Sequence, residues 1–192
     1  FEVGENLFGL RKYRDRGSIF YKIINYIYLR SLGIKVPFSC IFFGPILVRT
    51  FGKKPNIKVG KKVIFMPYVE LKTRENGTII INDNCKLDTL SRVIAAQEAI
   101  VCLGKGTEIG IGTVINGGDD ITLGNNCGVG GYCTFVSSEH KYGPAETILD
   151  GEYTRSPIEI GSNCWLAAGS MIRPGTRLGK NCVVSSGSVV SG

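Results

Sequence analysis

The residue best suited to chemistry in this chain is His140, which is its only histidine. An imidazole has a pKa of about 6.5, so it can accept or donate a proton near neutral pH. The residues that follow it, 141–157, interrupt an otherwise regular repeat, and long excursions of this kind in compact domains are usually functional. The sequence therefore predicts His140 as a general base.

Two further residues, Glu139 and Trp165, are candidates for the same site. Glu139 precedes the histidine and would orient the imidazole or bind a substrate, although adjacent residues on a strand point to opposite faces. Trp165 is the only tryptophan. It stands at a repeat position that faces outward, where it would line a binding site or pack against residues 141–157.

These residues are positioned by a six-residue repeat. The first position is Leu, Ile, Val or Phe, the second is mostly Gly or another small residue, and the fifth is compact. From Leu103 the units read LGKGTE, IGIGTV, INGGDD, then LGNNCG, VGGYCT, FVSSEH, then IGSNCW, LAAGSM, IRPGTR, LGKNCV and VSSGSV. Less regular units begin at Val59.

Three such units form one coil of three short parallel strands. The first position must be buried against the same position in the coils on either side, and the fifth points into the narrow interior, so it must be small. Because one coil cannot bury its own apolar face, several must stack. The sequence therefore predicts an all-β solenoid of about six coils.

The seven cysteines fit this pattern better than they fit a disulfide or zinc site. The chain has no Cys-x-x-Cys pair and only one histidine. Five cysteines occupy fifth positions, and we expect them to be small buried residues. They are Cys85, Cys127, Cys133, Cys164 and Cys182. No metal is expected.

The N-terminal part has another character. Ser18 can cap a helix that runs to about Leu32 and ends at Gly33. The expected organisation is a helix and loop segment over residues 1–57 and a solenoid over 58–192, with an inserted loop at 141–157. No stretch is long and apolar enough to span a membrane, and no signal-peptide pattern is seen. With unpaired thiols, this indicates a cytoplasmic location.

The N-terminal part also differs from the solenoid in its charge. Residues 1–62 hold 13 Lys and Arg against 3 Asp and Glu, whereas the remaining residues hold 10 against 13. Such a basic segment favours an anionic partner, and we expect an acidic glycan or peripheral contact with the inner face of a membrane rather than nucleic acid. A solvated basic surface with no partner remains the alternative.

The repeat resembles that of the hexapeptide acyltransferases from Val59 to Gly192. The stretch that begins Pro157-Ile-Glu-Ile-Gly-Ser-Asn-Cys-Trp and ends Gly-Ser-Val-Val looks like the acetyl-CoA-binding end of the maltose, galactoside and serine O-acetyltransferases. The N-terminal Leu-Arg-Ser-Leu-Gly-Ile-Lys-Val-Pro looks like relatives that acetylate capsule and O-antigen polysaccharides.

This resemblance implies a left-handed parallel β-helix that assembles as a homotrimer, with active sites between neighbouring subunits. It implies transfer of an acetyl group from acetyl-CoA directly to a sugar hydroxyl, with His140 as the base. The acceptor-binding candidates are Asn116, Glu139 and Tyr142. The candidates for binding acetyl-CoA are Trp165, Ala168, Ser186 and Ser191. Asn116 is also explained by a corner of the coil, where asparagine tolerates a left-handed backbone.

Three other functions have to be compared. An N-acetyltransferase acting on a nucleotide-linked amino sugar would use the same fold and base. A zinc enzyme of the carbonic-anhydrase kind on the same fold needs three histidine ligands, and this chain has one. A solenoid that serves only as a scaffold would bind no acetyl-CoA.

Overall fold

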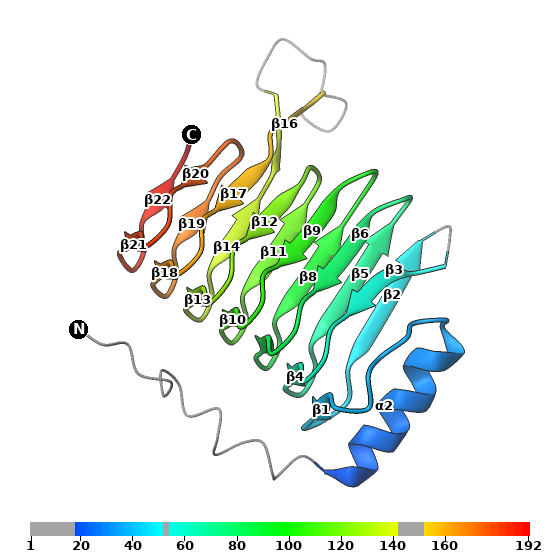
Figure 1. Cartoon of the computed structure of the whole chain (residues 1–192). Coiled ribbons are helices and arrows are strands. Elements are labelled where there is room, and N and C mark those ends of the chain that lie inside the picture. Colours follow the sequence, from blue (N-terminus) through cyan, green and yellow to red (C-terminus); the bar gives the residue numbers. More distant parts are fainter. Residues whose placement is uncertain (1–17, 52–53, 142–151) are drawn as a thin grey trace, which may run out of the picture.

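The computed structural model describes residues 18–51, 54–141 and 152–192. It is a parallel β-helix, left-handed as the family resemblance implied, with three sheets wrapped around one core and, within these ranges, a single helix at one end (Figure 1). Strands that follow one another in sequence enter successive sheets, so each sheet gains one strand per coil. The predicted fold class is confirmed.

Sheet 1 is parallel and has seven strands. They are β1 (Ile41–Phe42), β4 (Ile64–Phe65), β7 (Lys86–Leu87), β10 (Glu108–Ile109), β13 (Gly128–Val129), β18 (Trp165–Leu166) and β21 (Val183–Val184). Sheet 2 also has seven. They are β2 (Leu47–Phe51), β5 (Glu70–Arg74), β8 (Arg92–Ala95), β11 (Val114–Gly117), β14 (Thr134–Val136), β19 (Met171–Ile172) and β22 (Val189–Val190).

Sheet 3 has six strands. They are β3 (Asn56–Val59), β6 (Thr78–Ile81), β9 (Ile100–Leu103), β12 (Ile121–Leu123), β17 (Ile158–Ile160) and β20 (Arg177–Leu178). These strands make six complete coils, and β21 and β22 begin a seventh. The first coil starts at Ile41, ahead of residue 58, where the repeat becomes regular. Phe42, Ile46 and Val48 keep the inward positions there, but without glycine at the second position the repeat is hidden.

The core follows the repeat. First-position side chains such as Phe65, Leu87 and Ile109 are buried in a continuous column, and the Phe42 and Phe65 rings stack with centroids 5.1 Å apart. The second position has little room, because a Cβ on Gly104 would lie 2.3 Å from the carbonyl carbon of Gly124. The fourth position takes a left-handed backbone, for example at Gly106 and Asn126.

Fifth-position side chains join the coils by hydrogen bonds. The Thr107 hydroxyl donates to the Gly124 carbonyl at 2.8 Å, and the Cys85 thiol makes the equivalent contact to the Gly104 carbonyl at 3.1 Å. Cys127 and Cys164 repeat it toward Gly161 and Gly179, both at 3.1 Å. All seven cysteines are free, and four of the five predicted fifth-position thiols are buried. Cys182 differs because it lies in the last coil, where it is partly exposed.

Burial should protect these thiols from alkylation. It raises the pKa of Cys85 from 9.0 to about 12 and that of Cys40 to about 11, so little reactive thiolate forms. We expect iodoacetamide at mildly alkaline pH to modify Cys182 in the folded protein and to leave Cys40 and Cys85 intact until guanidinium unfolds the chain. Peptide mass spectrometry would measure this, and equal rates at Cys85 and Cys182 would contradict the buried role.

The helix α2 (Ile19–Ser31) covers the first-coil end of the solenoid (Figure 1). Ser18 occupies the predicted N-cap position, although its side chain makes no capping hydrogen bond. The Asn25 amide donates to the Gly44 carbonyl at 2.9 Å and accepts from the Ile46 N–H at 3.3 Å. The helix thus satisfies backbone groups of the first coil that no further coil would meet. The described part of the chain contains no helix whose length and hydropathy suit a membrane span.

Candidate functional site

His140 lies where the chain leaves the solenoid. After β14 in sheet 2, β15 (Ser138–His140) pairs antiparallel with β16 (Tyr153–Arg155), and this hairpin projects from the fifth coil (Figure 1). The coil resumes at β17, with the Ile158 N–H donating to the Asp120 carbonyl at 2.9 Å. The interruption predicted from the repeat is therefore an excursion from the coil. Tyr142, the third acceptor-binding candidate, lies outside the described residues.

The imidazole of His140 is held by packing. It sits on the Tyr153 ring across the hairpin, with the ring centroids 4.2 Å apart and an angle of 39° between the planes. Its Nδ1 is buried and has no hydrogen-bond partner among the described residues. A buried polar nitrogen without a partner is costly, so this atom is a candidate to bind a substrate, a water or a group outside the described residues.

The Glu139 carboxylate forms an ion pair with Arg173. The Arg173 Nε donates to Oε1 at 2.8 Å and its Nη2 donates to Oε2 at 2.6 Å, which makes a two-pronged ion pair. These hydrogen bonds hold the pKa of Glu139 below its ordinary value. Arg173 directly follows β19, so the pair ties the hairpin to the next coil. The Glu139 carboxylate therefore faces Arg173, and no hydrogen bond to the His140 imidazole is seen.

Arg173 was not among the candidates from the sequence. The signal that could have found it is its place in the unit IRPGTR, where it occupies a second position that glycine or another small residue usually takes. A long charged side chain at that position has to leave the coil, because the neighbouring coil leaves it no room.

Asn116 lies near the same hairpin. It is on β11, where it is aligned with Val136 of β14, and its carbonyl accepts from the Ser137 N–H at 3.3 Å. The Asn116 side chain is half-buried on the outer face of sheet 2, one coil before the strand that leads to His140. The structure thus brings Asn116, the Glu139–Arg173 pair and His140 to one region.

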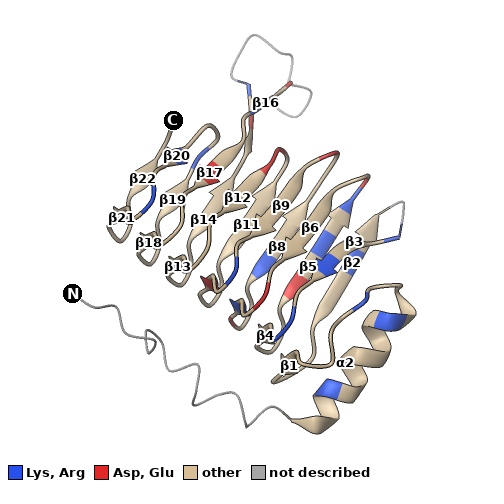
Figure 2. Ribbon diagram, viewed as in Figure 1, with Lys and Arg blue, Asp and Glu red and all other residues tan. Residues whose placement is uncertain are grey.

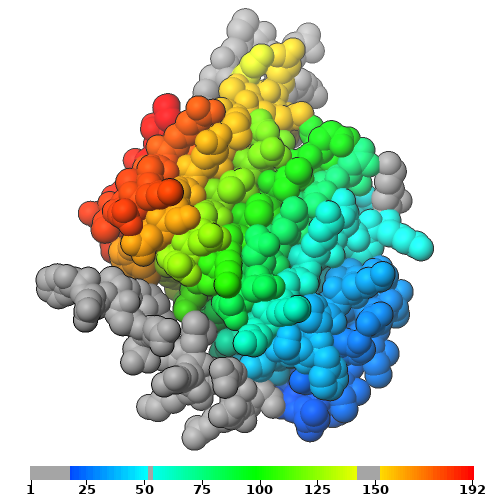
Figure 3. All heavy atoms as spheres, viewed as in Figure 1, coloured from blue at the N-terminus to red at the C-terminus, as the bar shows by residue number. Residues whose placement is uncertain are grey.

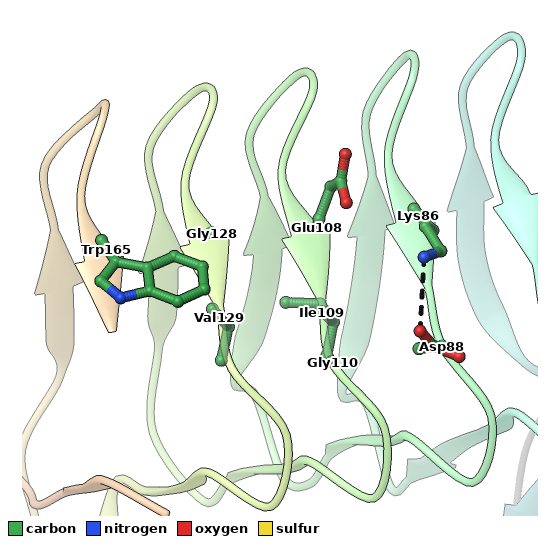
Figure 4. A pocket seen from close by; sticks show the side chains of 8 residues that line it. All are labelled: Lys86, Asp88, Glu108, Ile109, Gly110, Gly128, Val129 and Trp165. Atoms are coloured by element: carbon green, nitrogen blue, oxygen red, sulfur yellow. Dashed lines mark ion pairs between the residues drawn. The ribbon is translucent and has the colours of Figure 1, made fainter. Parts of the chain in front are cut away.

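Trp165 lies on another face of the molecule. It is on β18 in sheet 1, 39% exposed, and its indole covers Gly128 of the preceding coil (Figure 4). A Cβ on Gly128 would lie 2.6 Å from the Trp165 Cε3, so the ring can lie there only because residue 128 is glycine. The outward position predicted for the indole agrees with this exposure.

The indole forms one end of a groove of about 170 Å³ along sheet 1. Its lining consists of Lys86, Asp88, Glu108, Ile109, Gly110, Gly128, Val129 and Trp165. Lys86 and Asp88 form an ion pair at 3.3 Å. Burial raises the pKa of Glu108, which Lys86 opposes and Asp88 reinforces. Sequence reasoning missed these charged residues, which stand at sixth and second positions on the outer face.

The three remaining cofactor-binding candidates lie on the last coils. Ala168 and Ser186 are third-position residues of successive coils and occupy the same corner, where the Ala168 carbonyl accepts from the Gly187 N–H at 3.0 Å. Ser191 lies beyond sheet 2, after β22. All three are exposed. Trp165 therefore shares its end of the solenoid with Ala168 and Ser186, and Ser191 lies at a different corner.

No group of three or more His, Cys, Asp or Glu side chains within residues 18–51, 54–141 and 152–192 could hold a metal ion.

Comparison with known proteins finds a family match for the last part of the chain. Residues 157–192 match the model of the bacterial transferase hexapeptide family (six repeats). This confirms the resemblance that the repeat units carried, and the coils of this hexapeptide-repeat protein extend the matched pattern toward the N-terminus.

Other comparisons add less. No curated protein matches the hexapeptide-repeat chain. Among solved structures it is similar to the polySia specific acetyltransferase NeuO, at 20% identity and a TM-score of 0.43, over 80% of this chain and 78% of that chain. Neither value supports assigning an acceptor to this protein.

Proposed function

We propose that this hexapeptide-repeat transferase moves an acetyl group from acetyl-CoA to a sugar hydroxyl, with His140 as the general base. The observation that carries the proposal is the placing of the only histidine on a hairpin that leaves the coil, with its ring held by Tyr153 and its Nδ1 unpartnered among the described residues. A hydroxyl is a poor nucleophile until its proton is removed, and an imidazole suits that role at neutral pH.

The reaction would be a direct transfer. The imidazole takes the hydroxyl proton as the oxygen attacks the thioester carbonyl, which forms the new C–O bond. The resulting oxyanion, which a backbone N–H of a neighbouring coil would stabilise, collapses and breaks the C–S bond. Coenzyme A leaves as a thiolate, and the imidazolium returns the proton. The product is the acetylated sugar.

A second subunit is part of this proposal. His140 leaves the solenoid after sheet 2, whereas the Trp165 groove is built on sheet 1. Large exposed apolar side chains on the outer faces of the last coils support an interface, and they are Met171, Val183 and Val189. In a homotrimer, Trp165, Ala168, Ser186 and Ser191 of one subunit would hold acetyl-CoA near His140 of the next.

The acceptor-binding part would be formed by Asn116, Glu139 and Tyr142. Because Glu139 is paired with Arg173, its contribution would be to hold the hairpin in place. A capsule or O-antigen polysaccharide is the proposed acceptor, met in the cytoplasm or at the inner face of the membrane. The basic residues of the first coils favour an acidic polymer.

Calorimetric titration of acetyl-CoA into the purified protein, run beside an assay of coenzyme A release with added glycans, tests the function. We expect acetyl-CoA to bind and coenzyme A to be released only when an acceptor is present. Failure to bind acetyl-CoA would remove the acetyltransferase proposal and leave a scaffold. Release with amino sugars alone would favour the N-acetyltransferase.

Arg173→Met should lower the turnover of the transferase on the order of tenfold, because a small displacement of a base costs much of its effect. The pKa of Glu139 is depressed, so the stabilisation that the pair provides is present above the ordinary carboxyl pKa and is lost as the pH falls through the lowered pKa. Thermal unfolding should therefore separate wild type from Arg173→Met near neutral pH and not in strong acid.

Arg173→Lys is the matched control, since it keeps the charge and loses the two-pronged geometry. We expect its turnover to lie between those of wild type and Arg173→Met. A stability difference between wild type and Arg173→Met that is independent of pH would contradict the role given to the ion pair.

A further inference from the structure

The outward face of α2 is apolar and uncovered by the described residues. Its side chains are each 45% exposed or more, and they are Ile19, Phe20, Ile23, Ile24 and Ile27. This spacing places them on one side of the helix. The opposite side is buried on the first coil through Asn25 and Leu29. One side of the helix therefore packs on the solenoid, and the isoleucine side is left exposed.

The chain around this face is cationic. Residues 18–51 and 54–69 contain eight Lys and Arg and no Asp or Glu. Figure 2 shows Lys and Arg on α2 and on the neighbouring strands β2 and β5, where Glu70 at the start of β5 is paired with Arg49 of β2. A surface that combines exposed isoleucines with an excess of cations is complementary to an apolar layer bordered by negative charge.

Cations and aromatic rings line one flank of the face. Lys22 Nζ lies 3.9 Å from the centroid of the Phe38 ring, and Arg30 Nη2 donates to the Tyr26 hydroxyl at 2.8 Å. Phe38 itself is 63% exposed. Amphipathic aromatic and long basic side chains of this kind are favoured at the boundary between lipid headgroups and acyl chains.

We propose that α2 docks on an anionic lipid surface, with its isoleucine face in the headgroup region and Lys22 and Arg30 directed to the lipid phosphates. A helix of 13 residues is about 20 Å long, which suits lying in the plane of the interface. Binding gains from the buried apolar area and from attraction between the basic residues and the anionic lipids. This proposal is independent of acetyl transfer.

A second copy of the chain fits this face less well. Two copies joined through α2 would bring two clusters of cations together, and residues 18–51 and 54–69 supply no carboxylate to offset them. An anionic bilayer removes that repulsion and covers the isoleucines at the same time. Residues of α2 are drawn in blue at the lower right of Figure 3.

Vesicle cosedimentation with the full chain tests the proposal. Wild type should bind vesicles of phosphatidylcholine and phosphatidylglycerol, bind phosphatidylcholine alone weakly, and lose affinity as salt is raised. The double variant Ile23→Asp, Ile27→Asp should bind the anionic vesicles with an affinity lower by roughly tenfold or more, because two charges would enter the apolar layer. Lys22→Glu with Arg30→Glu should lose the preference for anionic lipid.

Leu90→Asp is the matched control, because Leu90 is 58% exposed on a corner of the solenoid and remote in sequence from α2. Its vesicle binding should equal that of wild type. Thermal unfolding and light scattering would check that each variant is folded and has the mass of wild type. The proposal is overturned if wild type does not bind anionic vesicles or if the α2 variants bind as well as wild type. It is also overturned if the isoleucine variant has a smaller mass, which would make the face an interface between copies.

Discussion

Replacing His140 by alanine should lower acetyl transfer by about 10²- to 10⁴-fold, which is the usual contribution of a general base. The affinity for acetyl-CoA should stay at the wild-type value, because the proposed cofactor contacts are built on sheet 1 and the last coils. Calorimetry would measure the affinity, and release of coenzyme A with an acceptor would measure the rate. Among the described residues the imidazole packs on the Tyr153 ring of the hairpin, outside the solenoid core, so its removal should leave the solenoid intact.

Lys141→Met is the control for this variant. Lys141 follows the histidine and forms an exposed ion pair with Glu152 at 2.6 Å. Exposed pairs contribute little, so this change should leave the rate near that of wild type. If the rate of acetyl transfer fell only slightly in His140→Ala and severely in Lys141→Met, the hairpin would be needed for the reaction and the imidazole would not. A mild loss in His140→Ala with an amino sugar as acceptor would favour transfer to nitrogen.

The solenoid could be predicted because one physical requirement acts on every coil. Each first position is buried against its neighbours above and below, so the period is repeated in the sequence at positions such as Leu103, Ile109 and Ile115. The cysteines became interpretable for the same reason. The repeat could not be recognised in the first coil because Phe43 and Arg49 stand at second positions, where glycine is usual. This coil also packs against α2 on one side, so its residues meet different neighbours from those of the inner coils.

The site was less predictable, because its contacts do not follow the repeat. The Glu139–Arg173 pair joins residues 34 positions apart across an excursion from the coil. The groove beside Trp165 depends on outward positions from four successive coils, and outward positions carry no periodic constraint. His140 is a candidate from the sequence because it is the only histidine and stands where the period stops, and its role stays a prediction. The partner of its Nδ1 could not be predicted, because no described residue supplies one.

Coil stacking also determines which substitution should harm stability most near the site. Phe135 is fully buried, and it occupies the first position of the unit that ends at His140. Its backbone is aligned with Ile115 in the coil before and with Ile172 in the coil after. In a solenoid each coil is supported only by its neighbours, so a cavity here weakens two interfaces at once.

Phe135→Ala should therefore lower the free energy of unfolding by about 3–5 kcal/mol, the range for a phenylalanine truncated in a core. Guanidinium unfolding at matched protein concentration would measure it. Phe51→Ala is the control, because Phe51 is 56% exposed on β2 and contacts Lys72 only through its ring face, 4.8 Å from the ammonium to the centroid. That change should cost about 1 kcal/mol or less. Equal losses in the two variants would mean that the column of first-position side chains does not hold the coils together, and that the backbone ladders alone do so.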